Sequence, residues 1–299
     1  MLEETLTQQF AVPAKARVFV ENVRGLVDIQ PGESGQIIVT AEKFPETGNA
    51  NRTEIQITQE DGGDVRVRTH YREGLADLFR FRGGQICKVE YTLHVPQGAA
   101  ITVETVSSVV KISGLAGAFA LETVSGDLTL QDLEGPCKLE TVSGSCSGRG
   151  LRGPLGFSSV SGDGRFEGGT FEGIDIETVS GDVRVESPLG PGLTQLKTVS
   201  GNIWISLPIP VQARVRTSTV SGHIRHPWKQ FPAAQLVDSP EIRFTSISGN
   251  LEIKHPALEQ PPADPHTRLD VLEQIASGSL TVDEALSVLA AGEASGMGR

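Results

Sequence analysis

A block of about 18 residues repeats along the middle of the chain, and it constrains the fold more than any other feature. Its centre is a Thr-Val-Ser-Gly-type sequence, and the apolar residue of this sequence recurs at Val106, Val124, Val142, Val160, Val179, Val199, Val220 and Ile247. The successive spacings are 18, 18, 18, 19, 20, 21 and 27 residues. Eight copies at a nearly constant period indicate a repeat architecture rather than a conventional globular core.

Each copy predicts two short strands joined by a Ser-Gly turn. After the glycine come two apolar residues separated by one, such as Leu128 and Leu130, which is the alternation of a strand with one buried face. A unit of 18 to 21 residues is too short for a strand with a crossover helix, but it can form one coil. We therefore predict an all-β fold, a parallel β-solenoid of about eight or more coils. We expect right-handed winding, with successive coils stacked about 4.8 Å apart.

The repeated valine has two interpretations. Strict alternation through residues 121–125 places Val124 outside, yet this position is apolar in all eight copies. We favour burial at a bend, because long exposed apolar patches are rare on monomers. The alternative is an apolar stripe along the outside, which would be the best docking surface of the molecule.

The regions on either side of the repeats predict a modular chain. Residues 1–100 form an N-terminal β region of degenerate coils or a cap, with strands at 37–41, 54–58, 65–69 and 89–95, and residues 101–255 hold the repeats. Between two of these strands, residues 71–84 mix apolar and basic side chains. We interpret them as a packed loop or, alternatively, as a docking loop for an acidic partner or a membrane surface, with Arg72, Phe79, Arg80, Phe81 and Arg82 as its candidate residues.

A change of period near the C-terminus predicts a helical hairpin. Residues 256–266 are a Pro-rich linker, residues 267–292 carry apolar residues at helical spacing, and 293–299 form a tail. Thr281 and Glu284 fit a capping box. Two such short helices need a packing partner. We expect them to mediate self-association or to dock a protein partner through Leu269, Leu272, Ile275, Leu286 and Leu289.

The recurring Thr-Val-Ser-Gly-Asp unit resembles a bacterial family of “putative adhesin” β-strand-repeat proteins of unknown function. Residues 89–99 look like the entry into that family's repeats, and residues 20–27 are similar to its N-terminal opening. The likeness covers roughly residues 15–255. Residues 269–289 look like the short helical hairpin of this family, which usually precedes the β region. The resemblance implies a scaffold or envelope-stress role and carries over no catalytic residue.

Charge, cysteines and hydropathy exclude several classes of protein. With 37 acidic and 26 basic residues the net charge is −11, which disfavours nucleic-acid binding. Three cysteines do not make a disulfide framework or a metal-binding CxxC pair. There is no signal-peptide pattern and no long apolar stretch, so we expect a cytoplasmic protein, peripheral at the membrane at most.

Candidate chemical sites all have a simpler structural interpretation. Asp163 and Asp182 follow turn glycines in adjacent copies, where carboxylates commonly accept backbone N–H groups, and one column of them does not suffice for calcium. The glutamate column is interpreted as a solvated face, with a cation- or partner-binding face as the alternative. His223, His226 and His255 are not spaced as zinc ligands, and Trp204 and Trp228 are interpreted as packing residues rather than a sugar platform.

The sequence thus predicts a non-enzymatic scaffold or adhesin-like interaction protein without catalytic residues, metal or cofactor. Two other functions stay open. One is a carbohydrate-active β-helix enzyme using Asp163 and Asp182, and the other is a membrane-stress sensor that binds lipid or peptide through the 71–84 loop.

Overall fold

In the computed structural model, residues 4–60, 62–71, 86–209, 213–228 and 240–254 are described. The chain divides into two units, Met1–His255 and Pro256–Arg299, and all described residues belong to the first. Across these residues the regular structure consists of β-strands and two short 3₁₀ turns, Pro45–Thr47 and Ala50–Arg52, without an α-helix.

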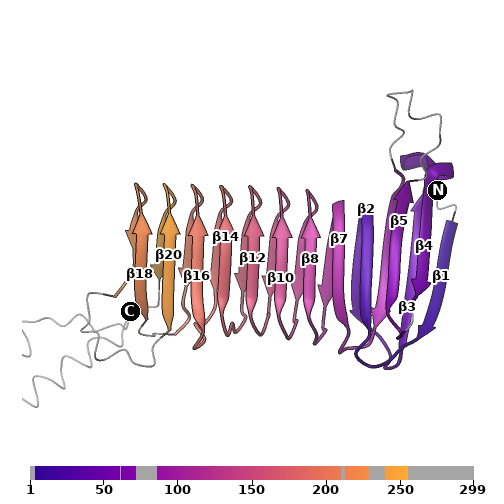
Figure 1. Ribbon diagram of the computed structural model, residues 1–299, viewed down its shortest axis with the longest axis horizontal. Helices are drawn as coiled ribbons and strands as arrows, with labels where there is room; N and C mark the ends of the chain where they lie inside the picture. Colours follow the sequence, from indigo (N-terminus) through magenta and orange to yellow (C-terminus); the bar gives the residue numbers. More distant parts are fainter. Residues whose placement is uncertain (1–3, 61, 72–85, 210–212, 229–239, 255–299) are drawn as a thin grey trace, which may run out of the picture. The chain divides into compact units, whose positions relative to one another are not determined.

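The strands form two ladders that share β2 (Arg17–Pro31) and β7 (Ala100–Ser113). The first ladder runs in space through β4 (Thr53–Gln59), β5 (Val65–Tyr71), β2, β7, β8 (Phe119–Thr123), β10 (Cys137–Thr141), β12 (Leu155–Ser159), β14 (Ile174–Thr178), β16 (Leu193–Thr198), β20 (Glu241–Ser246) and β18 (Arg214–Thr219). Figure 1 shows this row of strands side by side.

The second ladder is built from the other strand of each coil. Its order in space is β1 (Glu4–Ala11), β3 (Gln36–Phe44), β6 (Lys88–Val95), β2, β7, β9 (Leu128–Gln131), β11 (Cys146–Arg149), β13 (Gly164–Glu167), β15 (Val183–Glu186), β17 (Ile203–Ser206), β21 (Leu251–Lys254) and β19 (Ile224–Arg225). All pairings from β2 to β19 along this ladder are parallel, which confirms the predicted β-solenoid.

Equivalent residues of successive copies lie directly beside one another, because the parallel pairings keep the register of the repeat. Leu121 pairs with Leu139, Leu139 with Phe157, and Phe157 with Ile176. Their side chains are at most 1% exposed and form one continuous apolar core with those of the second ladder. Burial of these stacked columns is the main stabilising contribution that the fold provides.

The N-terminal end departs from the parallel pattern. β2 pairs in register with β7 along both ladders and so adds a coil to the repeats. Beyond it, β3 runs antiparallel to β6, β1 antiparallel to β3, and β4 antiparallel to β5. These hairpin-like pairings end the stack of parallel coils, and the partly buried Leu6, Phe10, Ile55 and Ile57 pack on the core there.

The last two coils do not stack in sequence order, which corrects our expectation. Strands β20 and β21 lie between the preceding coil and β18 and β19, although β18 and β19 come earlier in the chain (Figure 1). Ile247 therefore lies between Val199 and Val220 in space. The last copies carry the same Ser-Gly turn, so their coils are chemically able to stack in either order.

The predicted fold class is wrong in its helical part. The described structure contains strands and short 3₁₀ turns only. Residues 267–292, which were predicted to form the hairpin, lie outside the described residues. Helices of about ten residues have little stability of their own, so a periodic apolar pattern alone is not enough to specify them.

Candidate interaction groove

The residues that the sequence predicts to bind a partner through the helical hairpin and the 71–84 loop lie outside the described residues. This holds for the hairpin positions Leu269, Leu272, Ile275, Leu286 and Leu289, and for the loop positions Arg72, Phe79, Arg80, Phe81 and Arg82. The structure therefore tests neither set. A candidate site emerges instead along the corner where the first ladder turns into the second.

The repeated valines lie on the outside of the molecule, so our preferred prediction of burial is wrong. We call them the valine row, which in spatial order is Val106, Val124, Val142, Val160, Val179, Val199, Ile247 and Val220. The first six side chains are 40–48% exposed, Ile247 is 56% exposed and the terminal Val220 is 82% exposed. The apolar stripe that we kept as an alternative is the observed arrangement.

In seven of the eight copies, the hydroxyl of the threonine or serine directly before the apolar residue explains why that residue faces outward. The hydroxyl of Thr141 points inward, and its Oγ1 accepts the N–H of Gly144 at 2.9 Å. The same bond joins Thr123 to Gly126, Ser159 to Gly162, Thr178 to Gly181, Thr198 to Gly201, Thr219 to Gly222 and Ser246 to Gly249. Alternation then forces the following residue out, and a Thr-x-x-Gly spacing is the sequence signal that would have predicted it.

Acidic side chains form a second row, parallel to the valine row and two residues before it. Strand pairing aligns Glu21, Glu104, Glu122 and Glu140, followed by Ser158, Glu177 and Lys197. Glu140 is paired with Lys138 at 2.6 Å and Glu177 with Lys197 at 3.7 Å. Within the described part of the chain, no ion pair is found for Glu104 or Glu122.

A groove of about 620 Å³ runs between these two rows. The glutamates form one wall, the valine row forms the other, and the buried threonines form the floor. It extends over six neighbouring coils, from Val23 on β2 to Glu177 on β14. An exposed aliphatic wall facing an acidic wall is able to bind a partner that presents apolar and cationic groups together.

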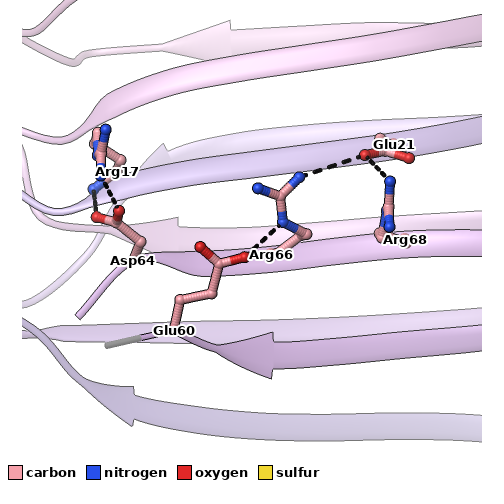
Figure 2. A network of polar contacts seen from close by, with 6 residues as sticks. All are labelled: Arg17, Glu21, Glu60, Asp64, Arg66 and Arg68. Carbon is pink, nitrogen blue, oxygen red and sulfur yellow. Dashed lines mark hydrogen bonds and ion pairs between the residues drawn. The ribbon is translucent and has the colours of Figure 1, made fainter. Parts of the chain in front are cut away.

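Two arginines of β5 form ion pairs with acidic side chains, among them Glu21 at the β2 end of the groove (Figure 2). Glu21 accepts an ion pair from Arg68 at 2.8 Å and from Arg66 at 3.6 Å, and Arg66 also contacts Glu60 at 2.9 Å. The Nε of Arg68 is buried and has no hydrogen-bond partner among the described atoms. The acidic and basic side chains at this end are thus paired with one another, whereas Glu104 and Glu122 in the middle of the groove have no ion pair among the described residues.

Arg17 and Asp64 extend the same network away from the groove. The Arg17 side chain donates to Asp64 at 2.5 Å, and its backbone N–H donates to the same carboxylate at 3.3 Å. The side-chain hydrogen bond lowers the pKa of Asp64, against the burial that raises it. The guanidinium groups of Arg66 and Arg17 lie 4.8 and 5.9 Å from the ring centre of Phe19. This cluster joins β2 to β5.

The aspartate column has a structural role. Asp163 accepts the backbone N–H of Asp182 at 2.8 Å, and Asp182 accepts that of Asn202 at 3.0 Å. Each carboxylate thus links its coil to the next, which agrees with the turn interpretation and leaves fewer oxygens for catalysis. Among the described residues, no cluster of three or more His, Cys, Asp or Glu side chains is arranged to hold a metal ion.

The histidines and tryptophans do not gather into one site: Trp204 and His223 line one hollow of about 340 Å³, whereas His226 lies beside Trp228. The ring centres of His226 and Trp228 are 6.0 Å apart, and Trp228 is buried. Trp204 lies on β17, where the guanidinium of Arg184 stacks 4.3 Å from its ring centre. His255 lies outside the described residues.

A second hollow, of about 570 Å³, borders the start of the first-ladder strands, but its large apolar side chains are buried apart from Leu193.

Two stacked ladders of parallel strands place this protein among the parallel β-solenoids. The Toastrack DUF4097 family matches residues 17–254, and the chain belongs to this family. This confirms the predicted membership of a β-strand-repeat family of unknown function. No helix in the described residues is long and apolar enough to span a bilayer.

Similar solved structures share little sequence with this chain. A “putative adhesin” from Parabacteroides merdae is 10% identical, with a TM-score of 0.44, and the match covers 84% of this chain and 96% of that chain. A “putative lipid binding protein” from Parabacteroides distasonis is 11% identical, with a TM-score of 0.41 and coverages of 83% and 96%. A “putative adhesin” from Bacteroides fragilis is 13% identical, with a TM-score of 0.39 and coverages of 85% and 98%. No curated protein is similar enough to this chain to match it.

Proposed function

We propose that the protein is a non-catalytic interaction protein that binds an elongated partner along the groove between the valine row and the glutamate row. The observation that carries this proposal is the exposure of Val106, Val124, Val142 and Val160 in one line, each 45–48% exposed. Aliphatic side chains repeated in this way on a surface favour binding, because monomeric proteins rarely expose contiguous apolar patches.

The chemistry of the partner follows from the opposite wall. Glu104 and Glu122 are exposed carboxylates without an ion pair among the described residues, and they lie beside the exposed valines. A partner with aliphatic and cationic groups satisfies both walls at once. The alternative of a carbohydrate-active enzyme has less support, because Asp163 and Asp182 hold backbone amides of neighbouring coils.

The test is to select peptides against the immobilised full-length protein and against two variants. The double variant Val124→Asn, Val142→Asn removes aliphatic surface from the groove. Thr129→Asn, Ser147→Asn is the matched control, because it changes exposed residues of the same two coils on the second ladder. We expect the wild type and the control to enrich sequences that combine aliphatic residues with Lys or Arg.

The selected peptides should bind the valine variant at least about tenfold more weakly, since two aliphatic contacts are lost. Unchanged circular dichroism and thermal unfolding would show that both variants are folded. Equal binding of the selected peptides to the wild type and to the valine variant would refute the groove as the binding surface.

A further inference from the structure

We infer that the groove accepts a basic amphipathic α-helix that lies along the solenoid axis, with its apolar stripe on the valine row and its Lys or Arg side chains on Glu104 and Glu122. This inference rests on the proposed function and adds the conformation and charge of the partner. Two independent features of the groove support it, namely its spacing and its charge.

The spacing of the valine row fits a helix better than an extended chain. Neighbouring valines belong to neighbouring coils of a parallel ladder, which lie about 4.8 Å apart. Side chains on one face of an extended chain recur every ~6.6 Å, so they lose register with the row within two coils. A helix advances about 5.4 Å per turn, and a tilt of roughly 25° brings its apolar stripe into step with the valines.

The charge of the groove excludes three other occupants. A membrane rich in anionic lipids is repelled by the exposed Glu104 and Glu122. A second copy of the chain would bring another glutamate row and a net charge of −11. The chain's own residues 267–292 include four acidic residues and one basic residue. Attraction to the groove therefore requires a cationic partner.

The length of the groove sets the size of the helix. From Val23 to Val160 the groove spans five coils and four spacings, which is about 19 Å. At about 1.5 Å per residue, a helix of roughly 13 residues covers it. Such a segment is only marginally helical in water and becomes ordered on binding.

The experiment uses three synthetic peptides of about 14 residues and the full-length protein. One peptide places Leu and Lys on adjoining faces at helical spacing. The second has the same composition with Leu and Lys alternating, and the third replaces each Lys of the first with Glu. Fluorescence anisotropy measures the binding of each peptide to three proteins. They are the wild type, the double valine variant (Val124→Asn with Val142→Asn) and a double glutamine variant (Glu104→Gln with Glu122→Gln).

We expect the helical basic peptide to bind the wild type at least tenfold more tightly than the alternating and acidic peptides, and to gain helical circular dichroism when bound. The glutamine variant should bind it severalfold more weakly and with a smaller dependence on salt.

The outcomes separate this inference from the proposed function. One outcome is that the alternating peptide binds the wild type as tightly as the helical one and both bind the valine variant more weakly. That result would support the groove as a binding surface and refute the helical conformation of the partner. If the valine variant binds every peptide as well as the wild type does, the proposed function fails. Valine-dependent binding to phosphatidylglycerol vesicles, with none to the basic peptide, would overturn the inference in favour of a membrane.

Discussion

A Cβ atom on Gly144 would lie 1.9 Å from the carbonyl oxygen of Gly126 in the preceding coil. The glycines of the repeat therefore let two backbones approach each other at the corner beneath the valine row. The substitution Gly144→Ala forces this corner apart, and we expect it to reduce the free energy of unfolding by about 3 kcal/mol or more. Urea unfolding followed by circular dichroism measures the change.

Gly156 provides the matched control for this prediction. It lies in the neighbouring coil, on β12, and the nearest atom to a Cβ added at this glycine would be 3.8 Å away. We expect Gly156→Ala to change stability by less than about 1 kcal/mol, with a tendency to stabilise through the unfolded chain. Similar losses of unfolding free energy for both alanine variants would show that the close backbone approach at Gly144 does not require a glycine.

The inward hydroxyls of the corner make a separate contribution to stability. Replacing Thr141 by Val keeps the shape but leaves the buried N–H of Gly144 without its acceptor. We expect a loss of about 1–3 kcal/mol in the free energy of unfolding. Thr141→Ser should lose clearly less, because Ser159 already makes the same bond in the next coil. A Ser variant as unstable as the Val variant would contradict this explanation.

Hydrogen exchange should follow the spatial order of the last coils rather than their order in the chain. On β20, Ile242 and Phe244 are at most 1% exposed, whereas Val215 on β18 is only half-buried and Thr217 is exposed. We expect backbone amides of β18 to exchange at least about tenfold faster than those of β20. Mass spectrometry of peptic fragments can compare the two strands, and equal rates would argue against the inserted coil.

The three cysteine thiols should be unreactive in the folded protein. Cys87, Cys137 and Cys146 are at most 4% exposed and are free thiols. Burial raises the pKa of Cys137 to about 11, and burial with the nearby Cys137 raises the pKa of Cys146 as well. At pH 8 an aromatic disulfide reagent should label all three only after denaturation, since the thiolate is the reactive form. Rapid labelling of the native protein would contradict the described core.

Acid should weaken the link between β2 and β5. The pKa of Asp64 is lowered in the folded state, mainly by the hydrogen bond from Arg17. The carboxylate therefore contributes stability that is present above the unfolded pKa of about 3.9 and is lost as pH falls through the lower folded pKa. We expect Asp64→Asn to be less stable than the wild type at pH 7, with the difference shrinking below about pH 4. Urea unfolding of both proteins at pH 7 and below pH 4 measures this difference in stability. A difference that stays the same at both pH values would show that ionisation of Asp64 does not contribute to stability.

The repeat made the solenoid predictable, because residues such as Leu121 and Leu139 recur at one period and belong to one column. The outward direction of Val142 could also be predicted, since Thr141 and Gly144 are spaced for a local hydrogen bond. The insertion of β20 could not be predicted, because its corner is chemically equivalent to those of the other copies. The pairing of Glu21 with Arg68 depends on the distant register of β2 against β5, which no local pattern encodes.

The position of β20 and β21 has a consequence during synthesis of the chain. Ribosomes produce the strands of the terminal coil before those of the coil on which it finally rests. Chain elongation at about 5–20 residues per second leaves a delay on the order of seconds between Arg225 and Lys254. If β18 pairs with the free edge of β16 in that interval, the later segment has to displace it to reach its final place. Folding of this end then requires a strand exchange that the earlier coils do not undergo.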